Sequence, residues 1–228
     1  FFGTTGRTDL TDASRAVENA ASLHAAVHEK LATLGDTTLV FPAHGPGSVC
    51  GSGMAERPFS TIGEEKRYNE VFTLDRDTFA RKKGGERLPR PPYFRHMEVV
   101  NLSGGLDPVL ARGEVPLLDV DTFAERSRDR LVFDTREPEA FASGRIDRSY
   151  NIWLGGLPVF GGWLGDARSR VYVVTDRDGD VDAAVLHLTR IGIDNVAGAL
   201  AGGFGAWRGA GRPMPRSRVI TVRELEPD

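Results

Sequence analysis

Apolar residues recur at a helical spacing in the first part of the chain. Between Thr11 and Leu34 they fall three or four residues apart, and Gly35 follows the last of them. The period predicts an amphipathic helix, and the glycine is a typical stop signal. The next segment, TTLVFP at residues 37–42, predicts a short buried strand. The periodic positions of the helix are Val17, Ala20, Leu23, Val27, Leu31 and Leu34.

A capping signal predicts a second helix in this part of the chain. Thr61 and Glu64 have the spacing of a capping box. In that motif the threonine oxygen accepts a hydrogen bond from the backbone N–H three residues later. We therefore expect a helix to begin there and to run toward Phe72.

The second part of the chain has shorter apolar segments that alternate with helix-like stretches, which is typical of an α/β domain with a parallel sheet. Between the two parts, LSGGLDPVLARGE at residues 102–114 is rich in glycine and turn-forming residues. Such a composition favours a linker, and we predict domains of residues 1–107 and 108–228. The predicted strands are Leu131–Phe133, Tyr150–Ile152, Val171–Val174 and Asn195–Ala197.

Composition narrows the classes of partner. The formal net charge of −3 over 228 residues gives no electrostatic reason to expect a nucleic-acid partner. No apolar run approaches the ~20 residues that cross a bilayer, so we expect no membrane partner. The N-terminus lacks the basic flank and apolar core of a signal peptide. A single cysteine, Cys50, excludes an internal disulfide and is compatible with the cytoplasm, where we expect the protein.

Three segments of the second part carry a specific resemblance. LVFDTREPEAFASGRIDRSYNI (131–152), VYVVTD (171–176) and GGFGAWRGAGRP (202–213) resemble the rhodanese family of sulfur transferases. The resemblance implies a parallel-sheet α/β domain whose catalytic cysteine stands directly after the strand at 171–174. Thr175 occupies that position, and Cys50 lies far upstream.

The residues of this loop argue against sulfur transfer. A thiolate is polarisable and ionised near neutral pH, whereas a threonine hydroxyl stays protonated without a strong base beside it. Active relatives point backbone amides and a closing arginine at an anion, and Asp180 stands about where that arginine would be. Clustered carboxylates repel thiosulfate or a persulfide anion. The predicted degenerate loop consists of Thr175, Asp176, Arg177, Asp178, Gly179 and Asp180.

A second pair of residues follows the strand predicted at 131–133. Asp134 and Arg136 match the DxR segment of the rhodanese family. The resemblance implies that they connect the end of the strand to neighbouring loops. We therefore predict a structural ion pair rather than a catalytic pair.

The first part of the chain resembles the metallo-β-lactamase superfamily. The resemblance is to the C-terminal half of the catalytic domain in persulfide dioxygenase–rhodanese fusions and in glyoxalase II-like hydrolases. It implies the C-terminal half of an αββα sandwich followed by a rhodanese-like domain. We expect the chain to begin midway through the lactamase-like domain. The matching segments, in order, are FFGTTGRTDL (1–10), VFPAHGPGSVCG (40–51), STIGEEKRYN (60–69) and PPYFRHMEVVN (91–101).

The resemblance also bears on metal binding. It places the HxHxDH loop, a further histidine and an aspartate of the superfamily before Phe1. His44 matches the late histidine ligand. Arg7 matches an arginine beside the active-site cavity, but a local ion pair with Asp9 that orders the turn before the helix is an equally good interpretation of Arg7. One imidazole cannot hold a catalytic metal. We expect iron or zinc in the complete parent protein and no stably bound metal in this chain alone.

Two classes of function follow from these resemblances. The parent would be a metal-dependent enzyme of sulfur metabolism that oxidises a low-molecular-weight thiol persulfide, or alternatively a glyoxalase II-like thioester hydrolase. As it stands, the chain could instead serve as a non-catalytic binding or assembly module. The expected partners are the missing N-terminal half, or a second polypeptide that replaces it, and further copies of the chain in a homo-oligomer.

Overall fold

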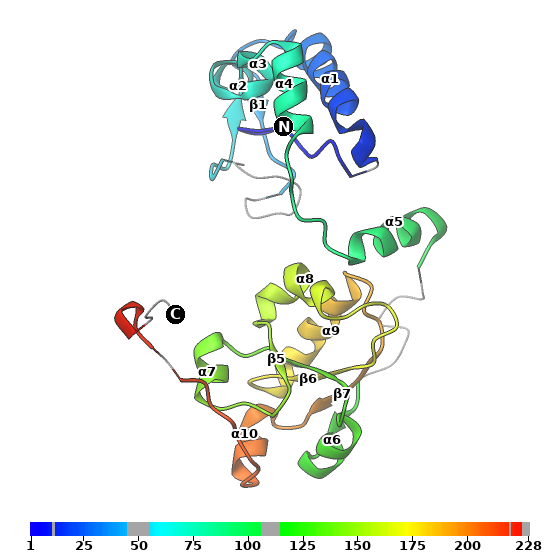
Figure 1. Ribbon diagram of the computed structural model, residues 1–228, viewed down its shortest axis with the longest axis vertical. Helices are drawn as coiled ribbons and strands as arrows, with labels where there is room; N and C mark the ends of the chain where they lie inside the picture. Colours follow the sequence, from blue (N-terminus) through cyan, green and yellow to red (C-terminus); the bar gives the residue numbers. More distant parts are fainter. Residues whose placement is uncertain (11, 45–54, 106–114, 219, 225–228) are drawn as a thin grey trace. The chain divides into compact units, whose positions relative to one another are not determined.

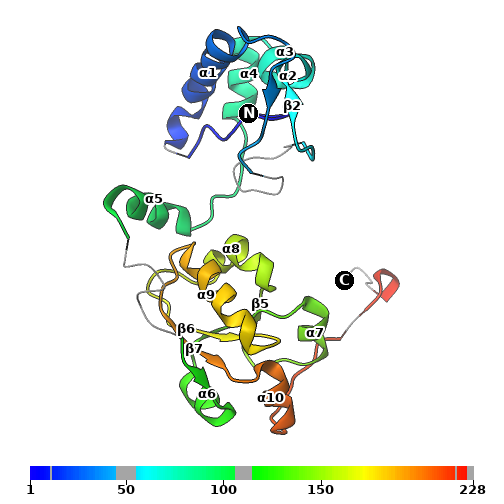
Figure 2. The same ribbon diagram turned by 180° about the vertical axis from the view of Figure 1, so that it is seen from behind.

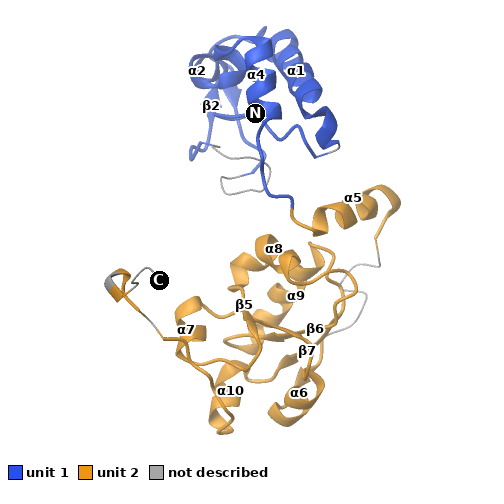
Figure 3. Cartoon of the chain, viewed as in Figure 1, with its two compact units in different colours: residues 1–90 blue, residues 91–228 orange. Residues whose placement is uncertain are grey.

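The computed structural model describes residues 1–10, 12–44, 55–105, 115–218 and 220–224. The chain divides into two compact units, Phe1–Arg90 and Pro91–Asp228 (Figure 3). This division falls earlier than the predicted boundary between residues 107 and 108, because helix α5 (Tyr93–Ser103) belongs to the second unit. Tyr93 packs on the core of that unit, and its hydroxyl donates to the carbonyl oxygen of Pro158 at 3.3 Å.

The predicted first helix is confirmed over most of its length. A short 3-10 turn at Ala13–Arg15 leads into α1 (Ala16–Ala26), and a π-helical turn at Val27–Leu31 continues it. The face that the period identified is only partly buried: Ala20 and Val27 lie in the core of the first unit, but Val17 and Leu34 are exposed.

The capping signal at Thr61 is confirmed, but the helix after it is shorter than predicted. Thr61 Oγ1 accepts the Glu64 N–H at 3.1 Å and caps α2 (Ile62–Tyr68). The chain leaves the helical conformation at Asn69 (φ −79°, ψ 125°), whose side chain accepts the Val71 N–H at 3.3 Å. This cap begins a separate helix, α3 (Glu70–Thr73), so the prediction of one helix to Phe72 was wrong.

The predicted strand at residues 37–42 is present but is not buried. It is β1 (Leu39–Val40), which pairs antiparallel with β2 (Ser60–Thr61). Leu39 and Phe41 are 54% and 69% exposed. The core of the unit lies instead where α1 packs against α4 (Arg76–Gly84).

The second unit is built on a five-stranded sheet, and every strand pair in it is parallel. The strand order is β3-β7-β6-β4-β5 (Figure 1). The predicted parallel α/β sheet is therefore confirmed, although β3 was missed and the last strand extends further than expected. The strands are β3 (Leu117–Leu118), β4 (Leu131–Asp134), β5 (Tyr150–Asn151), β6 (Val171–Val174) and β7 (Val196–Leu200).

Helices cover both faces of this sheet, as the continuous apolar run of β6 requires. Val171 and Val173 join the core on the side of α8 and α9, and Tyr172 and Val174 join the core on the side of α6 and α10. Figures 1 and 2 show these two layers. The helices are α6 (Val120–Arg126), α7 (Pro138–Ser143), α8 (Leu157–Phe160), α9 (Val181–Thr189) and α10 (Gly203–Gly209).

Candidate functional site

The loop after β6 lies at the carboxyl edge of the parallel sheet, where α/β proteins commonly place their sites. Asp134, the last residue of β4, is in register with Val174, the last residue of β6. The Thr135 N–H donates to the Val174 carbonyl oxygen at 2.8 Å. The loops that follow β4 and β6 therefore begin side by side.

Thr175 is fully buried at the start of this loop. Its hydroxyl donates to the carbonyl oxygen of Arg177 at 2.9 Å, and its own carbonyl oxygen accepts the Phe204 N–H at 3.1 Å. An amide carbonyl is not a base that can take the proton of the hydroxyl, so this contact does not activate Thr175 as a nucleophile. The geometry gives the residue a role in fixing the loop.

Three charged side chains of the loop, those of Arg177, Asp178 and Asp180, form contacts that hold it in place. Asp178 Oδ1 accepts the Gly202 N–H at 2.7 Å. Arg177 Nε lies 3.2 Å from a carboxylate oxygen of Asp180, and the rest of the Arg177 side chain is exposed. Asp176 is exposed at the surface. Two of the three carboxylates therefore stabilise the loop, and its one arginine is paired rather than directed at an anion site.

Two glycines after β7 allow the loop to close, and sequence reasoning missed them. Gly202 and Gly203 have φ values of +70° and +59°, a region that favours glycine. A Cβ on Gly203 would lie 2.5 Å from the Thr175 carbonyl oxygen and 2.6 Å from that of Asp176. The paired glycines of the GGFGAWRG segment were the available signal for this close approach.

Asp134 and Arg136 form a buried, two-pronged ion pair. Arg136 Nη2 lies 2.6 Å from Asp134 Oδ2, and Nε lies 2.8 Å from Oδ1. Nη2 also donates to the Gly144 carbonyl oxygen at 2.8 Å, and the guanidinium sits 3.6 Å from the centroid of the Phe204 ring. One arginine thus links the end of β4, the end of α7 and the start of α10. It does so by charge-assisted hydrogen bonds and a cation–π contact.

Arg7 lies buried in the first unit, its side chain 1% exposed. Its guanidinium contacts Asp9 at 2.7 and 2.9 Å and donates to the carbonyl oxygens of Leu88 and Pro89. The hydrogen bond from Arg7 holds the pKa of the Asp9 carboxyl below its usual range. The local ion pair is formed, and Arg7 also borders a cavity of about 310 Å³.

His44 is exposed at the end of a described segment, and Cys50 lies outside the described residues. Within the described ranges, no group of three His, Cys, Asp or Glu side chains is placed to hold a metal ion. The residues present in those ranges therefore do not fit a complete iron or zinc site. No helix among them is both long enough and apolar enough to span a membrane.

Comparison with known proteins identifies the second unit. Residues 113–210 match the sequence profile of the family described as "Rhodanese-like domain". The chain carries a rhodanese-like domain. The five-stranded parallel sheet and the loop of residues 175–180 lie within the matched range. No curated protein sequence matches the chain significantly.

A solved structure is similar across both units. The metallo-β-lactamase from Staphylococcus aureus subsp. aureus COL matches with a TM-score of 0.70 and 26% identity. The match covers 88% of this chain and 55% of that chain, so the present chain spans about half of the similar structure. The chain thus combines a partial metallo-β-lactamase-like match with the rhodanese-like sheet.

Two other structures match the chain only in part. A rhodanese-related protein from Thermoplasma volcanium is 25% identical, with a TM-score of 0.39, over 44% of this chain and 97% of that one. The thiosulfate sulfurtransferase from Pseudomonas aeruginosa is 22% identical, with a TM-score of 0.40, over 48% of this chain and 22% of that one. The assignment of the rhodanese-like domain rests on the family profile and on the sheet.

Proposed function

We propose that this chain is part of a metallo-β-lactamase/rhodanese fusion of sulfur metabolism whose rhodanese-like domain does not transfer sulfur. The observation that carries the proposal is the buried hydroxyl of Thr175, which donates to the Arg177 carbonyl oxygen at the end of β6. A persulfide carrier needs a thiolate at the reacting position. Here the side chain at the end of β6 instead stabilises the loop.

The parent protein would act as a persulfide dioxygenase. That reaction consumes a thiol persulfide, one dioxygen and one water, and it releases the thiol and sulfite. The metallo-β-lactamase match over 88% of the chain supports this class, and the rhodanese-like domain would be accessory to it. Because the described residues do not complete a metal site, no step of the reaction is assigned to them.

A dioxygen-uptake assay on the full-length parent tests this assignment. With glutathione persulfide as substrate, we expect oxygen consumption and sulfite release in equal amounts. Cleavage of a glutathione thioester without oxygen uptake would instead identify a hydrolase of the glyoxalase II type. If the parent shows neither activity, a non-catalytic binding module becomes the better account of the protein.

The inactive rhodanese loop is tested on the present chain. We expect no thiocyanate formation from thiosulfate and cyanide above the uncatalysed rate. We also expect Thr175→Cys to recover little activity, because Asp176, Asp178 and Asp180 keep the loop acidic and Arg177 is paired with Asp180. Turnover that survives Thr175→Ala, or efficient rescue by the cysteine alone, would show that the loop has been misassigned.

A further inference from the structure

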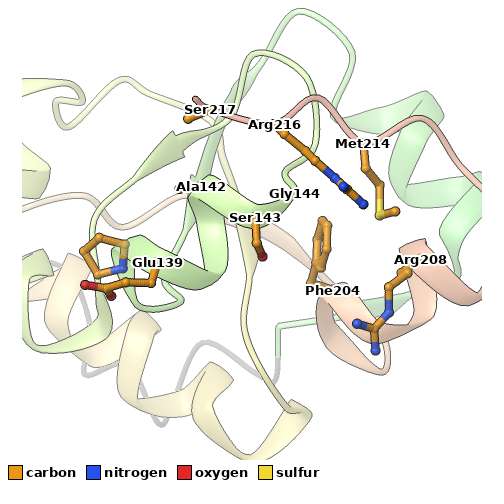
Figure 4. A pocket seen from close by; sticks show the side chains of 10 residues that line it. Glu139, Ala142, Ser143, Gly144, Phe204, Arg208, Met214, Arg216 and Ser217 are labelled. Carbon is orange, nitrogen blue, oxygen red and sulfur yellow. The ribbon is translucent and has the colours of Figure 1, made fainter. Parts of the chain in front are cut away.

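A pocket of the rhodanese-like domain shares no lining residue with the loop of residues 175–180. It has a volume of about 550 Å³ and lies between α7, α10 and the chain segment 214–217 (Figure 4). Sites for small molecules commonly enclose about 300–1,000 Å³. The pocket is therefore large enough for a small organic ligand.

Hydrogen bonds hold the wall that segment 214–217 contributes. The Arg145 N–H donates to the Pro215 carbonyl oxygen at 3.0 Å, and the Ser217 N–H donates to that of Ala142 at 2.9 Å. Arg145 Nη1 also donates to Ser217 Oγ at 2.9 Å. Just before the segment, Trp207 Nε1 donates to the Pro213 carbonyl oxygen at 3.0 Å. These bonds fix the wall, so a ligand would not have to order it.

The inner surface of the pocket is apolar. Phe204 and Met214 are among its lining residues, and the Phe204 ring is held against the buried guanidinium of Arg136, which lies 3.6 Å from the ring centroid. Gly144 keeps the space open: a Cβ there would reach contact distance, 3.6 Å, from the Phe204 ring. The pocket thus offers a fixed aromatic surface to an apolar group.

The rim of the pocket is basic on one side. Arg208 and Arg216 both line it, and neither has a carboxylate partner in the described part of the chain. The nearby Arg212, by contrast, is paired with Asp121. Glu139 lies on the other side of the pocket in Figure 4. Two guanidinium groups without an internal counterion favour an acidic group, which they can bind by charge-assisted hydrogen bonds.

We propose that this pocket binds a small organic anion, with a carboxylate or sulfonate at one end and an apolar body. The acidic group contacts Arg208 and Arg216, and the apolar body lies on Phe204 and Met214. Glu139 disfavours a second negative charge at the far end. The proposal goes beyond the proposed function, since it requires neither a metal nor sulfur transfer.

Titration of the isotope-labelled chain with hexanoate, followed by NMR, tests the proposal. We expect saturable shifts of the amide signals of Ser143, Gly144 and Phe204, and weaker binding of hexanol and hexylamine. The double variant Arg208→Gln/Arg216→Gln should lower the affinity for hexanoate about tenfold, since exposed ionic contacts contribute modestly.

Two controls separate a binding role from a structural one. Glu139→Gln changes charge at the same pocket in the opposite sense and should raise the affinity for hexanoate. Arg212→Gln removes a positive charge between α10 and segment 214–217, at a residue that does not line the pocket, and should leave the affinity for hexanoate unchanged. The proposal is overturned if hexanoate shows no saturable shifts at these residues, if hexanol binds equally well, or if the arginine double variant binds hexanoate like the wild type.

Discussion

Replacing Gly203 with alanine tests how the end of β7 closes on the loop after β6. Gly203 has a φ of +59°, and a Cβ there would lie 2.5 Å from the Thr175 carbonyl oxygen and 2.6 Å from that of Asp176. The carbonyl of Thr175 cannot move away freely, because it accepts the Phe204 N–H at 3.1 Å. The substitution therefore imposes both backbone strain and a clash with backbone atoms.

The two costs can be estimated separately. The left-handed conformation costs a residue with a Cβ about 1–2 kcal/mol, and overpacking typically costs about 1–3 kcal/mol. The reduced freedom of the unfolded chain returns up to about 1 kcal/mol. The expected net loss of unfolding free energy is therefore about 1–5 kcal/mol. For a unit of this size, such a loss lowers the Tm by on the order of 10 °C.

Tryptophan fluorescence during heating measures this change in the intact chain. Trp153, Trp163 and Trp207 are the only tryptophans in the sequence, and all three belong to the second unit. Gly205→Ala is the matched control, because no atom lies within 4 Å of its added Cβ and alanine favours the α10 helix. An unchanged Tm for Gly203→Ala, or an equal loss for Gly205→Ala, would refute the reasoning.

Three further predictions concern the metal content of the chain, the packing of Gly84 and the titration of His187. Elemental analysis of the purified chain should find substoichiometric iron or zinc, and one tightly bound metal lost on His44→Ala would contradict this. Gly84→Ala should destabilise the first unit by about 1–3 kcal/mol in chemical denaturation, since its Cβ would lie 2.6 Å from the Cα of Val17. Burial, with the charge of Arg190, lowers the pKa of His187 below its ordinary 6.5, so the unfolded chain takes up that proton first. Stability of the second unit should then be full above pH 6.5 and fall as the pH drops below it, and His187→Gln should flatten this dependence in fluorescence-monitored unfolding.

The elements that sequence reasoning identified are those whose signal is local. The apolar run of β6 and the period of α1 reflect single elements that bury one or two faces, and both were recovered. The strand β3 was missed because it is only two residues long and so carries no clear pattern. The break at Asn69 was missed because one residue both ends α2 and caps α3. Its side chain accepts the Val71 N–H, and the apolar pattern does not reveal this bond.

The candidate site was predictable only where one residue carries the chemistry. The absence of a cysteine after β6 is visible in the sequence, because Thr175 stands there. The use of Asp178 as a loop-stabilising group is not, since its partner Gly202 becomes a neighbour only when the loop closes on the start of α10. Asp180 pairs locally, with Arg177 three residues before it. From charge alone we expected these carboxylates to repel an anion. In the structure, Asp178 accepts the Gly202 N–H and Asp180 pairs with Arg177.

The same limit explains why the basic pocket was not anticipated. Phe204, Arg208, Met214 and Arg216 all come from residues 203–217, but the pocket forms only where this stretch packs against α7, which lies much earlier in the sequence. Arg136 connects the end of α7 to the start of α10, because it pairs with Asp134 while it contacts Gly144 and the Phe204 ring. The buried ion pair of the DxR segment thus positions the floor of a pocket on one side and the end of β4 on the other. These contacts give the pair a structural role that does not depend on a reactive residue at position 175.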